Sequence, residues 1–330
     1  MTGNRILITG ASGFVGQHLA ADLAKAGIKA KGTTRRPGPL SESVDWYTIS
    51  SGTDRAALRR AVDGVDTVFH LAARVHIPQS RLFDELDEYR RTNCEATSTL
   101  LHECAAAGVR RFIFASTVKV MGPYNGTPFT EEMIPDPEDA YAQSKLESES
   151  IVREVASRHS IDFVILRFPV IYGSHMKANM LRLFEAISSG MPLPFRGVSN
   201  TRSVLYVENA VAALRHVAAT EAAKGETFFI SDGTDYSTEE LVRLIAAAMK
   251  TSPRLFKVPS ALLRGTARLG DIVSGVIPFP ISSGIMARMF GSLTVDDSRI
   301  RRLTQFENRF TTSEGIARTA IWFLQRKLSG

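Results

Sequence analysis

The sequence predicts an α/β fold, with a doubly wound parallel sheet followed by a smaller C-terminal domain. Short apolar runs alternate with helical stretches through the first half of the chain, and such alternation requires crossover connections, which join parallel strands. A glycine-rich turn follows the first run. The composition, 44% hydrophobic and 22% charged over 330 residues, is that of a soluble globular protein. It excludes a disordered chain, a collagen-like fibre and a disulfide-rich scaffold.

The elements of the first half follow in order. Apolar runs predict strands at residues 5–9, 28–34, 67–70, 111–115 and 162–167. Between them, helical stretches predict helices at residues 13–26, 55–62, 83–107 and 141–158. Both faces of the sheet are therefore expected to be covered by helices.

In the second half of the chain, strands and helices no longer alternate regularly. After Gly173, prolines and glycines mark loops, and helices return near Val211, Leu241, Leu262 and Glu314. We predict a division between residues 1–172 and residues 173–330, with the second part completing a pocket and partly interleaved with the first.

Charge and hydropathy limit the partners. The net charge is +6 and the pI about 9.4, but the basic residues are scattered in pairs such as Arg110-Arg111, which predicts a solvated surface and no nucleic-acid partner. No apolar stretch is long enough to span a bilayer, and the strand predicted at Arg5 leaves no room for a signal peptide. We expect a cytoplasmic protein without stable membrane insertion.

The cysteines predict neither a disulfide nor a metal site. Cys94 and Cys104 lie on one predicted helix, roughly 15 Å apart along its axis, which exceeds the reach of a disulfide. Neither has neighbouring ligands at metal-binding spacing. We interpret both as helix-packing or surface residues.

The turn after the first strand has the spacing of a dinucleotide-binding site. Gly10, Gly13 and Gly16 form G-x-x-G-x-x-G between a predicted strand and a predicted helix. Glycines there permit the tight turn, the approach of a pyrophosphate to backbone N–H groups, and close packing of helix on strand. Turns use glycine freely, but this position predicts a Rossmann domain, with Phe14 and Val15 also next to the cofactor.

The end of the second strand favours NADP(H) over NAD(H). NAD sites usually carry an acid there that binds the ribose 2′-hydroxyl, whereas this strand ends Thr33-Thr34-Arg35-Arg36. Thr34, Arg35 and Arg36 suit a 2′-phosphate, because arginine pairs with phosphate through charge-assisted hydrogen bonds. The alternative is that the two arginines solvate a loop.

A tyrosine and a lysine four residues apart predict an acid–base pair. Tyr141 and Lys145 open a predicted helix and share one face of it. An ammonium group beside the phenol, with an oxidised nicotinamide, is expected to lower the pKa of Tyr141. Such a tyrosine can exchange a proton with an alcohol or sugar oxygen during hydride transfer. Ser116 and Thr117 add hydroxyls at the end of the preceding strand.

These motifs together resemble an extended short-chain dehydrogenase/reductase of the NAD-dependent epimerase/dehydratase family, whose members modify nucleotide sugars. The resemblance runs nearly end to end and includes residues 9–16, 70–73, 114–122, 141–145, 167–173 and 202–204. It implies cofactor contacts from Leu71, Ala72, Ala73 and Pro169. It also implies that Thr117 bonds the 4-oxygen of the sugar, whereas Ser116 is a structural or cofactor-side hydroxyl.

The resemblance further implies a UDP-sugar substrate and a homodimer formed by the helices at 83–107 and 141–158. Arg202, Asn179 and Arg288 match family residues that hold the nucleotide diphosphate. Where dehydratases of the family carry Asp-Glu, this chain has Val118-Lys119, which argues against 4,6-dehydration. Lys119 is either a surface lysine or a substrate contact.

Residues 114–120, 192–194, 200–203 and 231–233 more closely resemble a bacterial branch of this family. Its members are often labelled UDP-glucose 4-epimerases, although several are 4-keto reductases that form UDP-N-acetylquinovosamine for surface polysaccharide. Our leading hypothesis is therefore an NADPH-dependent C4 reductase of a UDP-4-keto-6-deoxy-hexosamine. The first alternative is a UDP-glucose or UDP-N-acetylglucosamine 4-epimerase that uses the same Thr117, Tyr141 and Lys145. The second is a non-catalytic NADP-sensing protein, which commonly lacks the tyrosine or the lysine.

Overall fold

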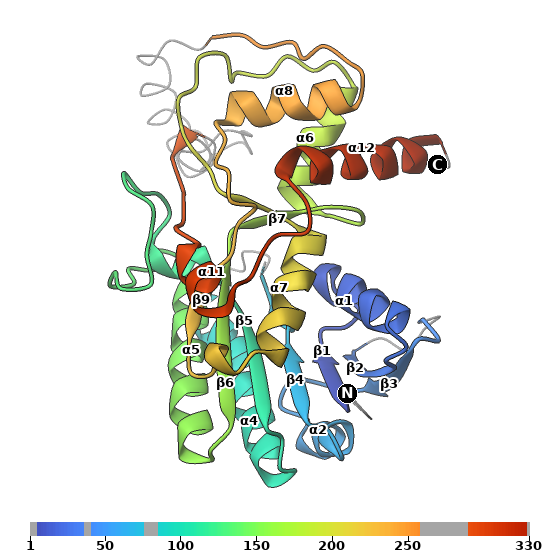
Figure 1. Ribbon diagram of the computed structural model, residues 1–330, viewed down its shortest axis with the longest axis vertical. Helices are drawn as coiled ribbons and strands as arrows, with labels where there is room; N and C mark the ends of the chain where they lie inside the picture. Colours follow the sequence, from blue (N-terminus) through green and yellow to red (C-terminus); the bar gives the residue numbers. More distant parts are fainter. Residues whose placement is uncertain (1–4, 36–40, 76–84, 258–289, 329–330) are drawn as a thin grey trace.

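The computed structural model describes residues 5–35, 41–75, 85–257 and 290–328. Its lower half is a seven-stranded parallel sheet with the strand order β3-β2-β1-β4-β5-β6-β9 (Figure 1). The predicted doubly wound α/β fold is confirmed. The strands are β1 (Ile6–Thr9), β2 (Ala30–Thr34), β3 (Val44–Thr48), β4 (Thr67–His70), β5 (Arg111–Thr117), β6 (Asp162–Phe168) and β9 (Thr227–Phe229).

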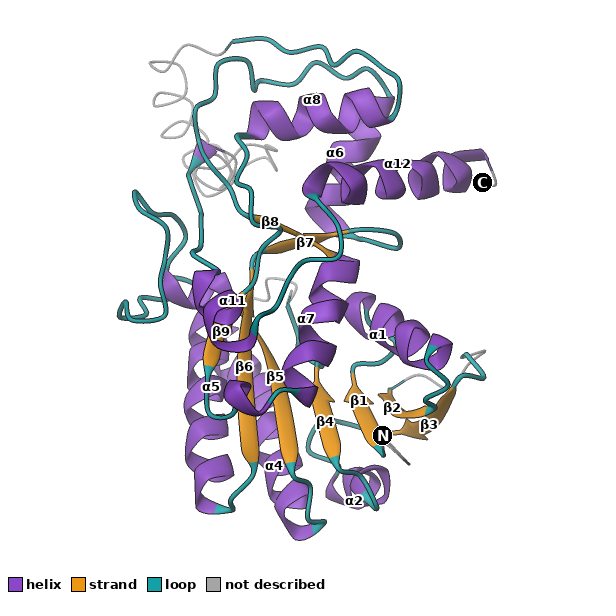
Figure 2. Ribbon diagram, viewed as in Figure 1, coloured by secondary structure: helices purple, strands orange, loops and turns teal. Residues whose placement is uncertain are grey.

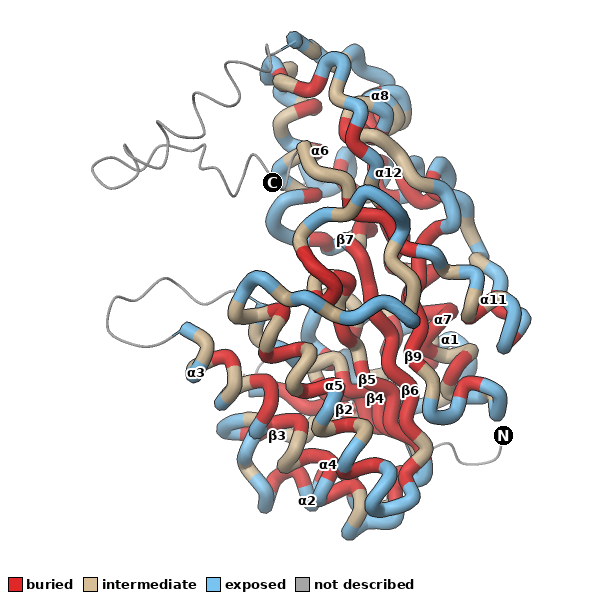
Figure 3. Tube along the Cα trace, turned by 90° about the vertical axis from the view of Figure 1, so that its left-hand side faces the viewer, coloured by how far each residue is buried: buried red, intermediate tan, exposed pale blue. Residues whose placement is uncertain are grey.

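Helices cover both faces of this sheet. Side chains of α1 (Phe14–Lys25) and α7 (Val207–Ala219) form one apolar core with the strands. Side chains of α2 (Arg55–Val62), α4 (Ala96–Ala106) and α5 (Ala140–Arg158) form a second core on the opposite face. Apart from the edge strand β3, the strands between these layers are buried along most of their length (Figure 3).

The strand order reverses between β1 and β4. In open parallel sheets, ligands bind beyond the carboxyl ends of the strands at such a switch point. β5 continues past the predicted end at Ala115 to include Thr117, which pairs with Phe168 of β6. The hydroxyl groups of Ser116 and Thr117 therefore belong to the strand itself.

A smaller lobe lies beyond the carboxyl edge of the sheet (Figure 2). It contains the two-stranded parallel sheet of β7 (Val170–Tyr172) and β8 (Val204–Tyr206), with α6 (Ala178–Ser188), α8 (Thr238–Ala248) and α12 (Thr312–Leu328), around an apolar core of its own. The short helix α11 (Ser298–Thr304) contacts β9. The predicted helix near Leu262 lies outside the described residues. Within the described ranges, no helix has both the length and the apolar character needed to cross a bilayer.

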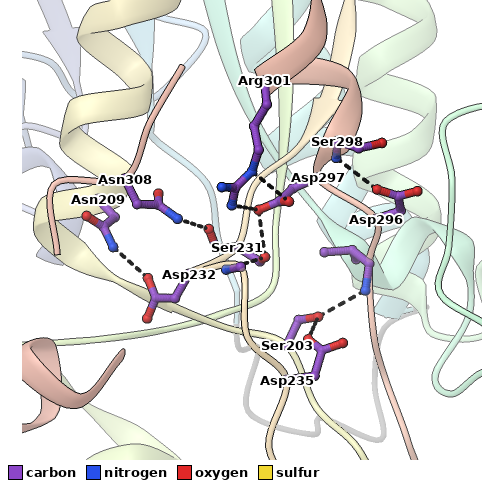
Figure 4. A network of polar contacts seen from close by, with 12 residues as sticks. Ser203, Asn209, Ser231, Asp232, Asp235, Asp296, Asp297, Ser298, Arg301 and Asn308 are labelled. Atoms are coloured by element: carbon purple, nitrogen blue, oxygen red, sulfur yellow. Dashed lines mark hydrogen bonds and ion pairs between the residues drawn. The ribbon is translucent and has the colours of Figure 1, made fainter. Parts of the chain in front are cut away.

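The chain passes between the lobes more than once, because α7 and β9 return to the sheet after β7 and β8. A polar network holds this junction together (Figure 4). Asp232, just after β9, accepts hydrogen bonds from the backbone N–H of Tyr206, from Asn209 Nδ2 and from Tyr172 Oη, each 2.8 Å long. Ser231 Oγ donates to Asp297, which also pairs with Arg301.

The helix predicted at residues 83–107 is confirmed over 85–106, but it is not a uniform α-helix. The described part divides into α3 (Glu85–Tyr89), a π-helical segment (Arg90–Glu95) and α4. The wider π turn lets two consecutive side chains contact α5, since Asn93 Nδ2 donates to Ser144 Oγ (3.0 Å) and Cys94 Sγ to the Ser144 carbonyl (3.2 Å). Both cysteines are free and buried, so packing rather than surface exposure is their role.

Candidate active site

The turn after β1 requires its glycines. Gly10 has φ +71°, in the left-handed region, and a Cβ there would come 2.8 Å from the backbone nitrogen of Ala72. A Cβ at Gly16 would overlap the carbonyl oxygen of Gly10 and come 2.8 Å from Ala11 Cα. The first glycine therefore permits the turn, and the last permits the close approach of α1, as the spacing predicts.

The amino end of α1 is suited to an anion. Gly13 is its N-cap, no side chain caps the helix, and no acidic residue lies in its first turn. The first backbone N–H groups are therefore open to a ligand, and the helix dipole favours negative charge there. Phe14 and Val15 are half-buried at this end. This cradle fits the pyrophosphate of a dinucleotide.

β2 ends beside this cradle without an acidic side chain. Thr34 is buried, and Arg35 follows it exposed at the carboxyl edge. A Cβ at Gly32 would come 2.9 Å from the Ala11 Cβ, so the absence of a side chain lets β2 approach the turn. Arg36 lies outside the described residues.

The segment after β4 is fixed by a buried histidine. His70 Nδ1 lies 2.6 Å from Thr9 Oγ1, and Nε2 lies 2.9 Å from Thr97 Oγ1. Burial, with a smaller effect of the Lys145 charge, lowers the pKa of His70 to about 3, so the ring is neutral at physiological pH. The backbone N–H of Ala72 donates to Thr9 Oγ1 (3.4 Å). Leu71, Ala72 and Ala73 thus line the same edge as the glycine turn.

Thr117 ends β5 and begins the next turn. Its Oγ1 accepts a hydrogen bond of 3.3 Å from the backbone N–H of Lys119 and caps the 3₁₀ helix Val118–Met121. Lys119 Nζ lies 2.7 Å from Asp139 Oδ2 and 5.7 Å from the centroid of the Tyr141 ring. Thr117 and Tyr141 are therefore connected through Lys119, at the carboxyl end of β5.

Tyr141 and Lys145 lie in the first turns of α5, which begins where Asp139 Oδ1 accepts the Ala142 N–H at 2.7 Å. Burial, followed by the charges of Asp139 and Tyr89, raises the pKa of Tyr141 above its usual value. The protein's own side chains therefore do not produce the expected lowering of the Tyr141 pKa. Burial also lowers the pKa of Lys145 to about 7, so the ammonium charge that was expected to act on Tyr141 is itself weakened.

A buried polar network lies one helical turn beyond Lys145, and the sequence does not predict it. Lys145 Nζ lies 3.9 Å from the centroid of the Phe114 ring. One turn on, Glu149 is 1% exposed and accepts hydrogen bonds from Arg167 Nε (3.0 Å), Arg167 Nη2 (2.7 Å) and Ser116 Oγ (2.6 Å). The Glu149 charge acts to raise the pKa of Lys145. Ser116, which is 6% exposed, thus directs its hydroxyl to the buried Glu149.

Asn93 is a second residue that the sequence analysis missed. Its amide accepts from the backbone N–H of Arg74 (2.9 Å) and donates to Ser144 Oγ, so it joins the segment after β4 to α5. The only sequence signal was an uncharged polar residue within an amphipathic helix.

Pro169 is buried between β6 and β7, where the sheet passes into the second lobe.

The predicted diphosphate ligands lie in the second lobe. Asn179 is exposed in the first turn of α6. Arg202 is half-buried before β8, its Nη1 donates to the Gly291 carbonyl (2.8 Å), and burial lowers the pKa of its guanidinium. Arg288 lies outside the described residues. Among the residues that the structure describes, no cluster of His, Cys, Asp and Glu could hold a metal ion.

Residues 6–231 match the model of the NAD dependent epimerase/dehydratase family. The chain is 33% identical over 329 residues to a UDP-glucose 4-epimerase of Vibrio cholerae, a match that covers 97% of this chain and 95% of that protein. It is 30% identical to a 3-beta-hydroxysteroid dehydrogenase of Mycolicibacterium neoaurum, over 95% of this chain and 89% of the other. Among solved structures it is similar to MoeE5 in complex with UDP-glucuronic acid and NAD, with a TM-score of 0.78, 26% identity and coverage of 98% and 99%.

Proposed function

The chain belongs to the NAD-dependent epimerase/dehydratase family, and on this premise we propose that it reduces the 4-keto group of a UDP-sugar with NADPH. It is an enzyme of the nucleotide-sugar epimerase/dehydratase type. The observation that carries the proposal is the meeting of the glycine turn, Thr117 and Tyr141 at one carboxyl edge of the sheet, beside the switch point. The substrate we propose is a UDP-4-keto-6-deoxy-hexosamine, which gives UDP-N-acetylquinovosamine.

Each residue of the site has one task in this reaction. The bound dinucleotide supplies the hydride. Tyr141 donates its proton to the oxygen at C4 as that oxygen gains electron density, and its raised pKa keeps it protonated beforehand. Thr117 Oγ1 hydrogen-bonds the same oxygen, and Lys145 holds the nicotinamide ribose. The diphosphate is held from the second lobe by Arg202 and Asn179.

The residues at the end of β2 support NADPH. Thr34 is the last residue of β2 and the exposed Arg35 follows it, at the position where an acid would bind a ribose 2′-hydroxyl. A reductase consumes reducing equivalents in every turnover, so a cofactor that exchanges suits it. We expect Arg35→Asp to weaken NADPH binding at least tenfold and to change NADH binding much less, because the lost contact is with the 2′-phosphate.

Dehydration of the sugar is disfavoured by the turn after β5. The two residues that follow Thr117 are Val118, which is buried, and Lys119. Neither supplies the carboxylate that removal of water requires. Reduction or epimerisation at C4 needs only the single proton that Tyr141 provides.

A 4-epimerase is the second candidate, favoured by the likeness to the Vibrio cholerae UDP-glucose 4-epimerase over nearly the whole chain. It uses Thr117, Tyr141 and Lys145 to oxidise C4 and return the hydride to the other face of the sugar. Such an enzyme regenerates its NAD and retains it.

The nucleotide content of the purified protein separates the two. The protein is denatured and the released nucleotide identified, and NADPH oxidation is then followed with a UDP-4-keto-6-deoxy-hexosamine. Protein that binds NADPH and oxidises it supports the reductase, with Tyr141→Phe expected to lose a factor of about 10²–10⁴ in rate. Tightly held NAD with no net oxidation of NADPH would refute the reductase and favour the epimerase.

Two further features belong to the proposal. Residues 1–172 form the dinucleotide-binding part and residues 173–330 mainly the substrate-binding part, with α7 and β9 interleaved. The working unit is a homodimer formed by α4 and α5, which contact each other on one face of the sheet. Sedimentation of the purified protein tests the second point, and a monomer would refute it.

A further inference from the structure

Two opposite charges lie beside Tyr141. Lys119 is two residues after Thr117, in the turn that Thr117 caps, and Asp139 is the N-cap of α5, two residues before Tyr141. Their side chains meet at 2.7 Å, and Lys119 Nζ lies 5.7 Å from the centroid of the Tyr141 ring. The side chains are 38% and 50% exposed, so this ion pair lies at the surface rather than in the core.

The two charges act on the phenol in opposite directions. A carboxylate disfavours the nearby phenolate, and the Asp139 charge does raise the pKa of Tyr141, second to burial. An ammonium group favours the phenolate, and Lys119 is near enough to the ring for such an effect. Lys119 also neutralises Asp139 through the ion pair, so its removal would strengthen the influence of the carboxylate.

Other titratable groups near this end of α5 have partners or lie deeper. Tyr89 of α3 has its ring centroid 5.9 Å from that of Tyr141. Charged groups on the elements packed here include the ion pairs Arg74–Glu88, Arg90–Asp87 and Arg90–Glu147, and the buried Lys145 and Glu149 of α5. The Lys119–Asp139 pair is thus the exposed charge pair that contacts Tyr141 in the described structure.

We propose that Lys119 and Asp139 act as a positioning pair that sets how readily the Tyr141 hydroxyl releases its proton, and so biases the site between donating and accepting a proton. The inference rests on the role of Tyr141 in the proposed function. The Asp139 carboxylate pairs with the Lys119 ammonium group through one oxygen and caps the start of α5 through the other. The turn that carries Thr117 and the helix that carries Tyr141 are thereby locked together.

Removing Lys119 or removing Asp139 should change the pKa of Tyr141 in opposite directions. Lys119→Met removes the positive charge and leaves Asp139 unpaired, so the pKa of Tyr141 rises. Asp139→Asn keeps the N-cap, because asparagine caps helices as well as aspartate does, and leaves an unpaired ammonium group, so the pKa falls. Each change in the pKa of Tyr141 should be about 0.2–0.7, the range for a partly exposed charge pair. Lys119→Arg keeps the positive charge, so the pKa of Tyr141 should stay at its wild-type value.

The primary measurement needs no sugar. The phenolate absorbance of the complex with oxidised dinucleotide is titrated in the near ultraviolet, and the curve of Tyr141→Phe is subtracted to isolate Tyr141. Lys29→Met and Asp45→Asn are matched controls, because that pair is also exposed, with its charged atoms 2.6 Å apart at the far edge of the sheet. They should leave the Tyr141 titration unchanged.

The second measurement is the pH profile of turnover with the keto sugar. The alkaline limb of the reductive rate should move up in pH for Lys119→Met and down for Asp139→Asn. Shifts in the same direction, or none, would overturn the inference while leaving the proposed function intact. A protein that binds no nicotinamide dinucleotide would overturn both.

Discussion

Glu149 offers the sharpest test of the buried network under Lys145. In Glu149→Gln, the Arg167 guanidinium, only 4% exposed, keeps its charge without a counter-ion. The substitution also weakens the two hydrogen bonds from Arg167 and the one from Ser116. Breaking one partner of a buried pair costs about 3–5 kcal/mol of folding free energy, because the charge that remains has no solvent.

The assay is urea unfolding of the full chain, with a control on the same helix. Glu154→Gln breaks an ion pair of the same length, 2.7 Å, to Arg158, but both side chains are more than 60% exposed, and it should cost under about 1 kcal/mol. Glu149→Met combined with Arg167→Met should recover much of the loss, because neither member of the pair is left buried without its partner. If Glu149→Gln cost no more than Glu154→Gln, the reasoning about burial would be wrong.

Three further predictions follow from contacts described above. Gly16→Ala should abolish dinucleotide binding and lower the folding stability, whereas Gly126→Ala, where a Cβ meets open space, should leave both unchanged; calorimetry measures both effects. Thr97→Val leaves His70 Nε2 buried without its partner and should cost about 1–3 kcal/mol in urea unfolding; a neutral effect would contradict the assigned hydrogen bond. Because the folded-state pKa of Lys145 is lowered to about 7, the unfolded chain holds one more proton between pH 7 and 10. Relative to Lys145→Met, the wild type should therefore gain up to about 1.4 kcal/mol of stability per pH unit above pH 7, and a flat difference would refute the shift.

The parts of the fold that the sequence predicts are those with a local signal. The central strands are apolar runs buried on both faces, and the glycine turn lies at the first strand–helix junction. β3 escaped prediction because it is an edge strand, half-exposed and without strict alternation. β7, β8 and β9 are three residues long, too short for any periodicity, and each exists only because a distant strand pairs with it.

The candidate site shows the same division. Tyr141 and Lys145 are predictable because helix geometry places residues four apart on one face. The π-helical segment is not, since the change of register involves one residue within an otherwise helical pattern. Glu149 and Arg167 are 18 residues apart and match no motif, so only the packing of α5 on β6 reveals them. The raised pKa of Tyr141 follows from burial, which the sequence does not contain.

The late position of β9 in the chain has a consequence for synthesis of the protein. β6 is complete at Phe168, but its outer neighbour begins only at Thr227. A ribosome that adds roughly 5–20 residues per second needs about 3–12 s to make the roughly 60 residues between them. During that interval the nascent sheet presents an open, apolar edge strand, of the kind that pairs with other chains. Until β9 pairs with residues 165–167, that edge of the sheet stays open to pairing with other chains.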